Sequence, residues 1–501
     1  MKPLRLLLVK PPPPEEVQRH ACPTPEAYRY EWEPVALMLL ADAVRRAHGD
    51  AIRVELWHLM DAADEARFVE RVRAEPPAIV AFGEIDLLVN AVSRCALAVK
   101  RVGPEVLTVV GGKQTTLLRR GDRFPFEGID LALRGDGAGP LVELVARLLA
   151  GDPGRDDLAG AVQVGDDGRV MDAGELAAYP ARAVDGIGLR STPVEGHPLG
   201  EYLARRNKFP SLVAGGAEDV RAAPVLFGVG CVHSCTFCQS PLEAPASGER
   251  VWSRDARSVA EEIAWLAEAH GVNSIFSLEA NLDLANLRAV YAELAALGID
   301  RLATSGFVRA ADVARAARRG LLRALAAKGL RTLSIGIDVP PNSQRDVYRK
   351  GFSFQSLVQA LEDCQQLGIL VSGTVVGDPT LTRDAFAAQL AQVGQLPLAS
   401  VDIRLAIALR GTAYFKEMEP YLIRHPDRDR GYFDRQNYRY QTLQLPGRIE
   451  PDETYRLVAD FYRGYLDAPA HGAYVARLRA EHPDTGPFFE RQRRAHAAMI
   501  R

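Results

Sequence analysis

Three cysteines within eight positions form the strongest chemical pattern in the chain. Cys231, Cys235 and Cys238 lie in the segment GVGCVHSCTFCQSP, where their spacing is C-x3-C-x2-C. Three thiolates on one tight loop can bind three irons of a cubane 4Fe–4S cluster, and the fourth iron then stays open to an exogenous ligand. The spacing also permits a structural zinc site with His233 as the fourth ligand. The loop follows a predicted barrel strand rather than lying in a small separate module, and this favours the cluster.

The elements that must position this loop alternate between strands and helices. Short apolar, partly β-branched runs are typical of parallel strands that are buried on both faces. From residue 224 to about 410, six strand–helix units predict a partial (β/α)6 barrel. The predicted strands are 225–229, 274–278, 301–305, 332–337, 370–376 and 401–407, and the predicted helices are 258–270, 284–297, 318–328, 353–367 and 383–393.

Residues 1–150 show a similar alternation in five units. They predict an α/β doubly wound domain, flavodoxin-like or Rossmann-like, in which ligands bind at the carboxyl ends of the strands. Residues 151–223 are rich in Gly, Pro and Asp and are predicted to be a connecting segment with one hairpin at 161–171. Residues 411–501 are predicted to be a small, mixed, α-rich region. The predicted strands of the first domain are 4–9, 52–57, 78–82, 106–110 and 129–133, its helices are 34–47, 62–74, 88–101, 115–120 and 139–150, and the helices of the C-terminal region are 451–466 and 487–500.

The composition excludes several classes of protein. The chain has 501 residues, of which 47% are hydrophobic and 25% are charged, and its formal net charge is −3. This length predicts two to four domains, and the composition excludes wholesale disorder and a disulfide scaffold. No basic field is present to bind nucleic acid, and no apolar run approaches the ~20 residues of a membrane span. We therefore expect a cytoplasmic protein and a monomer, with neither a nucleic-acid nor a membrane partner.

The cysteine loop resembles the signature of the radical S-adenosylmethionine (SAM) superfamily, which is C-x3-C-x-aromatic-C after the first strand of a partial α/β barrel. The resemblance implies a 4Fe–4S cluster whose open iron chelates SAM, a flavodoxin- or ferredoxin-type reductant, and a 5′-deoxyadenosyl radical that abstracts a substrate hydrogen. Residues 333–382 and 409–415 resemble later elements of the same family, so the resemblance covers about 224–465. It implies that SAM contacts Phe237, Glu279, Ser305, Arg309, Ser334, Asp338 and Gly377.

Several of these residues also have plainer interpretations, which the sequence leaves open. Glu279 could be a solvated strand end, and Arg309 could begin a surface helix. Asp338 could cap a turn, and the serines could simply pack between strands. Three other cysteines have no partner at ligand spacing, and two of them fall in predicted helices, where we expect small buried hydrophobic residues. The three are Cys22, Cys95 and Cys364, of which the last two are in the helices.

The first domain resembles that of the cobalamin-binding radical SAM enzymes. The likeness rests on a first strand that ends in Pro-Pro, on VVGGKQTT and on LRGDGAGPLVEL. Glycines at the strand ends would let the backbone approach a bulky cofactor closely. Gln114 stands where this family typically has His, and Asp136 and Ala138 replace its acidic pair, so a domain without cobalamin stays an alternative. The resemblance implies that cobalamin contacts Pro11, Pro12, Gly83, Glu84, Ile85, Asp86, Gly111, Gly112, Lys113, Gln114, Thr115, Gly135, Asp136 and Gly137.

These resemblances together imply a C-methyltransferase. It would transfer a methyl group through methylcobalamin to an unactivated carbon of a small molecule, after a 5′-deoxyadenosyl radical has removed a hydrogen. Two alternatives remain at this point. One is a radical SAM enzyme that rearranges or cyclises its substrate without methyl transfer, and the other is a non-catalytic iron–sulfur or corrinoid sensor.

Overall fold

The computed structural model of the chain describes most of both predicted domains. Among the predicted site residues, Ile85, Asp86 and Asp338 lie outside the described residues, and so does Cys22. The predicted helix 487–500 also lies almost wholly outside them. The described residues are 3–12, 34–59, 61–84, 88–152, 154, 157–174, 221–242, 251–337, 353–434, 440–485 and 488–490.

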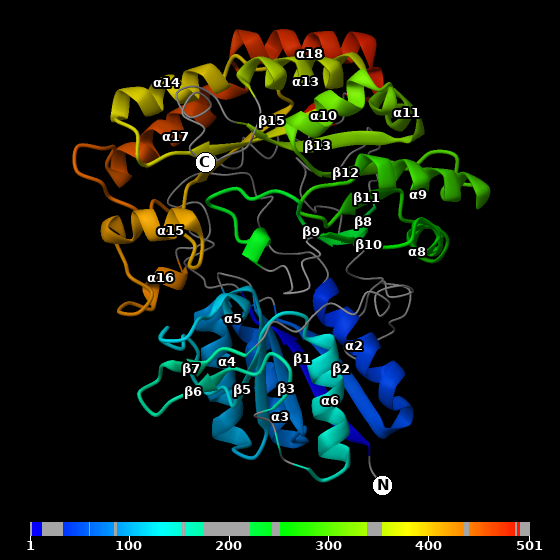
Figure 1. Cartoon of the computed structure of the whole chain (residues 1–501). Helices are drawn as coiled ribbons and strands as arrows, with labels where there is room; N and C mark the ends of the chain where they lie inside the picture. Colours follow the sequence, from blue (N-terminus) through cyan, green and yellow to red (C-terminus); the bar gives the residue numbers. More distant parts are fainter. Residues whose placement is uncertain are drawn as a thin grey trace.

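The first domain is a five-stranded parallel sheet in the order β2-β1-β3-β4-β5, which is the flavodoxin-like order. Its middle strands are buried on both faces: in β1, Leu6 and Leu8 belong to one apolar cluster, and Leu7 and Val9 to another. Helices cover both faces of the sheet (Figure 1). The strands are β1 (Leu4–Lys10), β2 (Ile52–His58), β3 (Ile79–Glu84), β4 (Leu107–Gly112) and β5 (Leu131–Leu133), and the helices are α2 (Val35–His48), α3 (Ala62–Ala74), α4 (Val89–Val102), α5 (Lys113–Leu117) and α6 (Ala138–Leu149). The predicted α/β doubly wound fold is confirmed.

A hairpin follows this domain at the predicted place. It consists of β6 (Gln163–Val164) and β7 (Val170–Asp172), which pair antiparallel. Arg134, next to the end of β5, donates through Nη1 to the carbonyls of Ala173 and Gly174, at 2.9 and 2.6 Å. The hairpin is therefore fixed to the edge of the first sheet.

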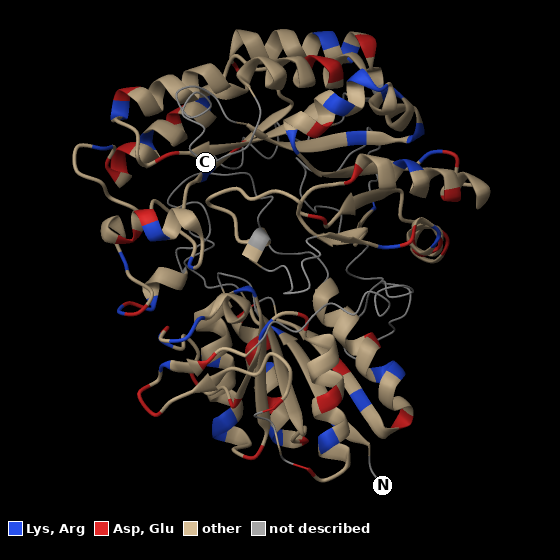
Figure 2. Ribbon diagram, in the orientation of Figure 1, with Lys and Arg blue, Asp and Glu red and all other residues tan. Residues whose placement is uncertain are grey.

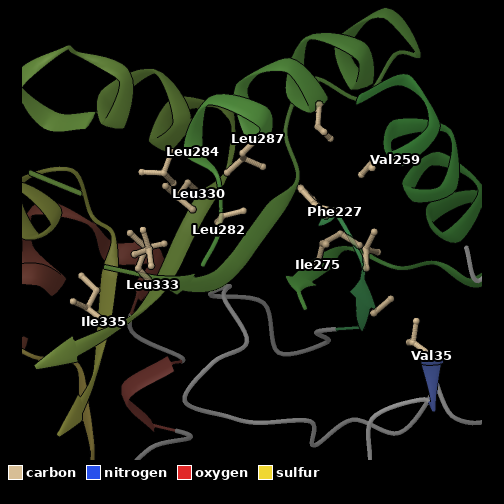
Figure 3. Close-up of a cluster of buried hydrophobic side chains, with 14 of the residues drawn as sticks. Val35, Phe227, Val259, Ile275, Leu282, Leu284, Leu287, Leu330, Leu333 and Ile335 are labelled. Atoms are coloured by element: carbon tan, nitrogen blue, oxygen red, sulfur yellow. The ribbon is translucent and has the colours of Figure 1, made fainter. Parts of the chain in front are cut away.

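The second domain contains six parallel strands in chain order, which is the arrangement of a partial barrel (Figure 1). Its helices pack on one face of the sheet. Figure 3 shows part of the apolar cluster between these helices and the sheet, including Leu287, Leu333 and Ile335. The strands are β8 (Ala222–Val225), β11 (Ser274–Ser277), β12 (Ala303–Val308), β13 (Leu330–Ile337), β14 (Leu370–Gly377) and β15 (Ser400–Leu405), and the helices are α8 (Ala256–His270), α9 (Leu284–Ala296), α10 (Ala310–Arg318), α11 (Leu321–Lys328), α13 (Phe354–Gln366) and α14 (Arg383–Val393).

The predicted strand 225–229 is wrong in one respect. The chain leaves the barrel sheet after Val225, and β9 (Gly228–Gly230) pairs antiparallel with β10 (Val251–Ser253). Arg254 explains the break, because its backbone N–H donates to the Phe227 carbonyl at 2.7 Å and its Nη1 to the Leu226 carbonyl at 2.9 Å. These carbonyls are thus turned away from the neighbouring barrel strand. The cysteine loop follows β9 and not a barrel strand directly.

Several helices were not among the predicted elements, including α18 (Pro469–Glu481) and α10, whose start at Arg309 the sequence offered only as an alternative. The buried face of α10 consists of three alanines and Val313. The buried residues of α18 are His471, Tyr474 and Leu478, and Gly472 lies among them. These faces carry few large apolar side chains, so tertiary packing stabilises both helices.

The segment after β15 packs against both domains. It contains α15 (Ala413–Met418), α16 (Gly431–Asp434) and α17 (Pro451–Tyr465). In Figure 1, α15 and α16 lie at the left, with α16 next to the first domain. Arg430 donates to Asn90 Oδ1 and Ser93 Oγ of the first domain, at 3.0 and 2.8 Å. Arg410 pairs with Asp122 at 3.7 Å and with Asp427 at 2.5 Å. These contacts tie the end of the barrel to the first domain.

Charge is spread over the whole molecule. Figure 2 shows basic and acidic residues interspersed on both domains, as the net charge of −3 leads one to expect. Within the described residues, no helix combines the length and the apolar character that a membrane crossing requires.

Candidate functional site

The cysteine loop is held by contacts from outside the barrel. The Cys238 backbone N–H donates to the Cys235 carbonyl at 3.2 Å, which closes a tight turn. The Tyr414 N–H in the first turn of α15 donates to the Thr236 carbonyl at 3.0 Å. Phe237 packs against the apolar cluster that contains Tyr414 together with residues of the first domain. The loop is therefore anchored to the segment that joins the two domains.

The three cysteines have the chemistry that an iron–sulfur cluster needs. Cys231, Cys235 and Cys238 are half-buried free thiols. Burial raises the pKa of Cys231, and the positive charge of Arg309 acts in the opposite direction. Within the described part of the chain, no three Cys, His, Asp or Glu side chains stand at metal-binding distance of one another. The donor set nevertheless fits a cluster, because thiolates are the ligands of cubane irons and all three belong to one loop.

His233, the candidate zinc ligand, is engaged with other residues. Arg309 contacts its Nδ1, and its Nε2 lies 3.8 Å from an oxygen of Asp312. Burial lowers the pKa of His233, and Arg309 lowers it further. The imidazole is therefore neutral near pH 7. Its two nitrogens face Arg309 and Asp312 and not the three thiols, which makes His233 a poor fourth ligand.

Glu279 lies at the base of the cysteine loop. The Ser277 hydroxyl donates to its Oε2 at 2.9 Å, and a Cβ on Gly228 of β9 would lie 3.1 Å from its Oε1. The side chain is buried, so the alternative of a solvated strand end is wrong. Burial, which disfavours the charged carboxylate, raises the pKa of Glu279 to about 7. A buried carboxyl that titrates near neutrality is a candidate for binding a cationic group.

We expect Glu279→Gln to stabilise the barrel at pH 8 and to have little effect at pH 5. The folded-state pKa of about 7 exceeds the ordinary value of 4.5, so the unfolded chain binds fewer protons between these values and stability falls as the pH rises. The full difference corresponds to up to about 3 kcal/mol, reached above pH ~7. Differential scanning calorimetry at both pH values measures it. An equal change in melting temperature at pH 5 and pH 8 would contradict the raised pKa.

The inner face of the barrel sheet is polar. Residues in register on neighbouring parallel strands share a face, and Thr374 and Asp402 are such a pair, as are Val376 and Arg404. The opposite face carries Val375 and Ile403, which pack in the apolar cluster with the helices. Among the predicted residues, Ser334 lies on the inner face, where its hydroxyl is 3.2 Å from that of Thr374.

Two other predicted residues are placed less favourably for side-chain contacts with a ligand. The Ser305 hydroxyl donates to the Ile275 carbonyl of the adjacent strand at 3.2 Å and is buried, as packing between strands would require. A Cβ on Gly377 would meet Leu405 and Phe386 within 3.3 Å, so this glycine could contact a ligand only through its backbone.

Sequence reasoning missed an ion pair on the inner face. Arg404 Nε donates to Asp402 Oδ2 at 2.7 Å, and both side chains are partly exposed. The signal was present in β15, SVDIRL, where polar and apolar residues alternate. In a strand with period two, this places the acid and the base on the same face.

The strand ends of the first domain carry the predicted cobalamin-binding residues. Gly112, at the end of β4, has φ 143° and ψ −159°, a conformation that is essentially restricted to glycine. The next loop is tied to it, because Thr116 Oγ1 donates to the Gly112 carbonyl at 2.7 Å and accepts from the Gly135 N–H at 3.2 Å. Burial raises the pKa of Asp136. Lys113 is exposed, Gly83, Gly111 and Gly137 are half-buried, Pro11, Pro12, Gln114 and Thr115 are buried, and Glu84 is the last residue of β3.

Residues 225–390 match the family model of the Radical SAM superfamily. The matched segment contains the cysteine loop, Glu279 and most of the barrel strands described above. This part of the chain is therefore a radical SAM domain, and the protein is a radical SAM enzyme.

Two curated proteins are similar to this chain over well beyond the matched segment. An uncharacterized methyltransferase of Pyrococcus horikoshii is 24% identical over 419 residues, which is 82% of each chain. The anaerobic magnesium-protoporphyrin IX monomethyl ester cyclase of Cereibacter sphaeroides is 25% identical over 333 residues, 64% of this chain and 49% of the cyclase.

Two solved structures have the same fold over nearly the full chain. The radical SAM methyltransferase TsrM from Kitasatospora setae, with tryptophan substrate and a SAM analogue bound, has a TM-score of 0.66 at 19% identity, covering 93% of this chain and 90% of TsrM. The cobalamin-dependent SAM radical enzyme OxsB, with aqua-cobalamin and SAM bound, has a TM-score of 0.66 at 13% identity, covering 100% of this chain and 72% of OxsB. The protein thus has the fold of the cobalamin-dependent radical SAM enzymes.

Proposed function

We propose that the protein is a cobalamin-dependent radical SAM methyltransferase that methylates an unactivated carbon of a small molecule. One observation carries the proposal: the cysteine loop lies close to the strand ends of the first domain. Gly411 lies between the two. A Cβ on Gly411 would be 3.2 Å from Leu242, just after the cysteine loop, and 3.8 Å from Leu117, in the helix that follows β4. A cluster on the loop and a corrin at these strand ends would then flank one reaction space.

In this proposal each part of the chain has a defined task. The cluster with SAM supplies a carbon radical, and cobalamin supplies the methyl group. Cys231, Cys235 and Cys238 bind the cluster, and Phe237 covers one side of the loop. The ionised Glu279 accepts hydrogen bonds from the SAM ammonium group. The remaining SAM contacts proposed from the sequence are those of Arg309, Ser334, Asp338 and the Gly377 backbone.

The first domain binds and orients the corrin through its strand ends. The Gly112 backbone and the buried Thr115 and Gln114 would lie against the cofactor, and Pro11 and Pro12 would fix the end of β1 beside it. A flavodoxin- or ferredoxin-type protein is the expected reductant. The polar inner face of the barrel, with the Asp402–Arg404 pair, suits a polar small-molecule substrate.

A second candidate is a rearrangement or cyclisation without methyl transfer. It is favoured by the likeness to the anaerobic cyclase of Cereibacter sphaeroides, whose name describes ring formation rather than methylation. The mass of the product distinguishes the candidates, because only methyl transfer replaces one substrate hydrogen by a methyl group.

The function is tested first by cofactor content. The protein is produced with cobalamin supplied, purified without oxygen, and its released small molecules are identified by absorbance and mass spectrometry. We expect one corrinoid per chain beside the cluster, and 5′-deoxyadenosine after reduction with SAM. A cluster with no corrinoid would contradict the methyltransferase and leave hydrogen abstraction alone.

A further inference from the structure

Arg309 is directed at the cysteine loop by a set of contacts that involves no cofactor. It is half-buried and immediately precedes α10. Its guanidinium contacts Nδ1 of His233, which lies between Cys231 and Cys235. An arginine has only donors, so Nδ1 accepts and the neutral imidazole carries its proton on Nε2, which faces Asp312.

Neighbouring side chains fix this arrangement. The backbone N–H of Arg309 donates to Asn281 Oδ1 at 3.1 Å, and Asn281 Nδ2 donates to Asp312 Oδ2 at 3.2 Å. Arg315, one turn further along α10, also pairs with Asp312 and is 56% exposed. Arg309, Asp312 and Arg315 together therefore carry one net positive charge. Of the two arginines, Arg309 is the one that contacts the cysteine loop.

We propose that Arg309 is a positioning residue whose charge, held against the cysteine loop through His233, raises the reduction potential of the bound cluster. The proposal rests on the proposed function, because it requires the cluster. Reduction adds a negative charge to the cluster, and a nearby guanidinium stabilises that charge, with little screening at a partly buried site. Charge and hydrogen bonds near the sulfurs are among the factors that set the potential of iron–sulfur clusters.

The test is a redox titration of the reconstituted full-length protein without SAM or substrate, followed by visible absorption and electron paramagnetic resonance. With Arg309→Gln, we expect the ratio of reduced to oxidised cluster at a fixed potential to fall about tenfold, which is about 59 mV for a one-electron couple. Arg309→Lys keeps the charge and should recover most of this ratio. Arg315→Gln is the matched control on the same helix: it also removes one positive charge, but from a side chain that is 56% exposed and screened by solvent, so we expect a clearly smaller fall than with Arg309→Gln.

A variant with the opposite expected effect keeps the proposal testable if Arg309→Gln fails to assemble a cluster. Asp312→Asn removes the negative charge that faces His233 and should raise the potential. The inference is overturned if Arg309→Gln titrates like the wild type, if Arg309→Lys falls as far as Arg309→Gln, or if Asp312→Asn leaves the potential unchanged or lowers it. A wild-type chain that assembles no cluster would contradict the proposed function itself, whereas an assembled cluster with an unmoved potential would contradict only this inference.

Discussion

Cys235→Ala is expected to abolish the iron–sulfur cluster and all cleavage of SAM. Cys235 is the middle cysteine of the loop and a proposed ligand, and its backbone carbonyl accepts the hydrogen bond that closes the turn to Cys238. Two thiolates on the same loop cannot bind three irons, so a stable cubane should not form. Iron and sulfide analysis, the visible spectrum and the yield of 5′-deoxyadenosine measure the loss.

The matched control is Cys364→Ala. Cys364 is a fully buried thiol on α13, and burial raises its pKa to a value at which it stays protonated, as expected for a small hydrophobic residue. This variant should bind iron like the wild type. Normal cluster content in Cys235→Ala would refute the assignment of the loop, and stoichiometric zinc in the wild type in place of iron would revive the zinc alternative.

Gly112→Val is expected to remove most of the bound corrinoid and to leave the cluster intact. The φ of 143° at Gly112 excludes a β-branched side chain without strain, which costs on the order of 1–3 kcal/mol. Relief of this strain would move the loop to which Thr116 and Gly135 are tied. Corrinoid absorbance after gel filtration, compared with iron content, measures the effect.

Gly151→Val provides a control for strain alone. Gly151 follows α6 in the same domain, with φ 74°, and a Cβ added there would have no atom within 4 Å. The variant should lower stability but retain the corrinoid, because α6 begins at the carboxyl ends of the strands and ends at the opposite edge of the sheet. Equal corrinoid loss in both variants would mean that Gly112 acts through stability and not through contact with the cofactor.

The sequence determined the elements whose signals are local. Five strands of the first domain and five of the six barrel strands begin or end within a few residues of the predicted positions, because an apolar run between polar turns is a local property. The cysteine spacing is enough to predict a cluster, since all three thiols lie on one loop. Helices with few large apolar residues were not among the predicted elements: α10 and α18 depend on packing.

Only the tertiary structure decided how these local features combine. Val225 and Gly228 lie three residues apart in one apolar run, yet Arg254 separates them into different sheets. His233 and Arg309 are 76 residues apart, and their contact follows from where β9 and β12 end in space. A local pattern fixes which face of a strand is buried, but long-range contacts between elements decide which side chains from different loops meet. The resemblance of the sequence to a known family predicted Arg309 as a site residue. Only the structure shows that its side chain contacts the cysteine loop, through His233.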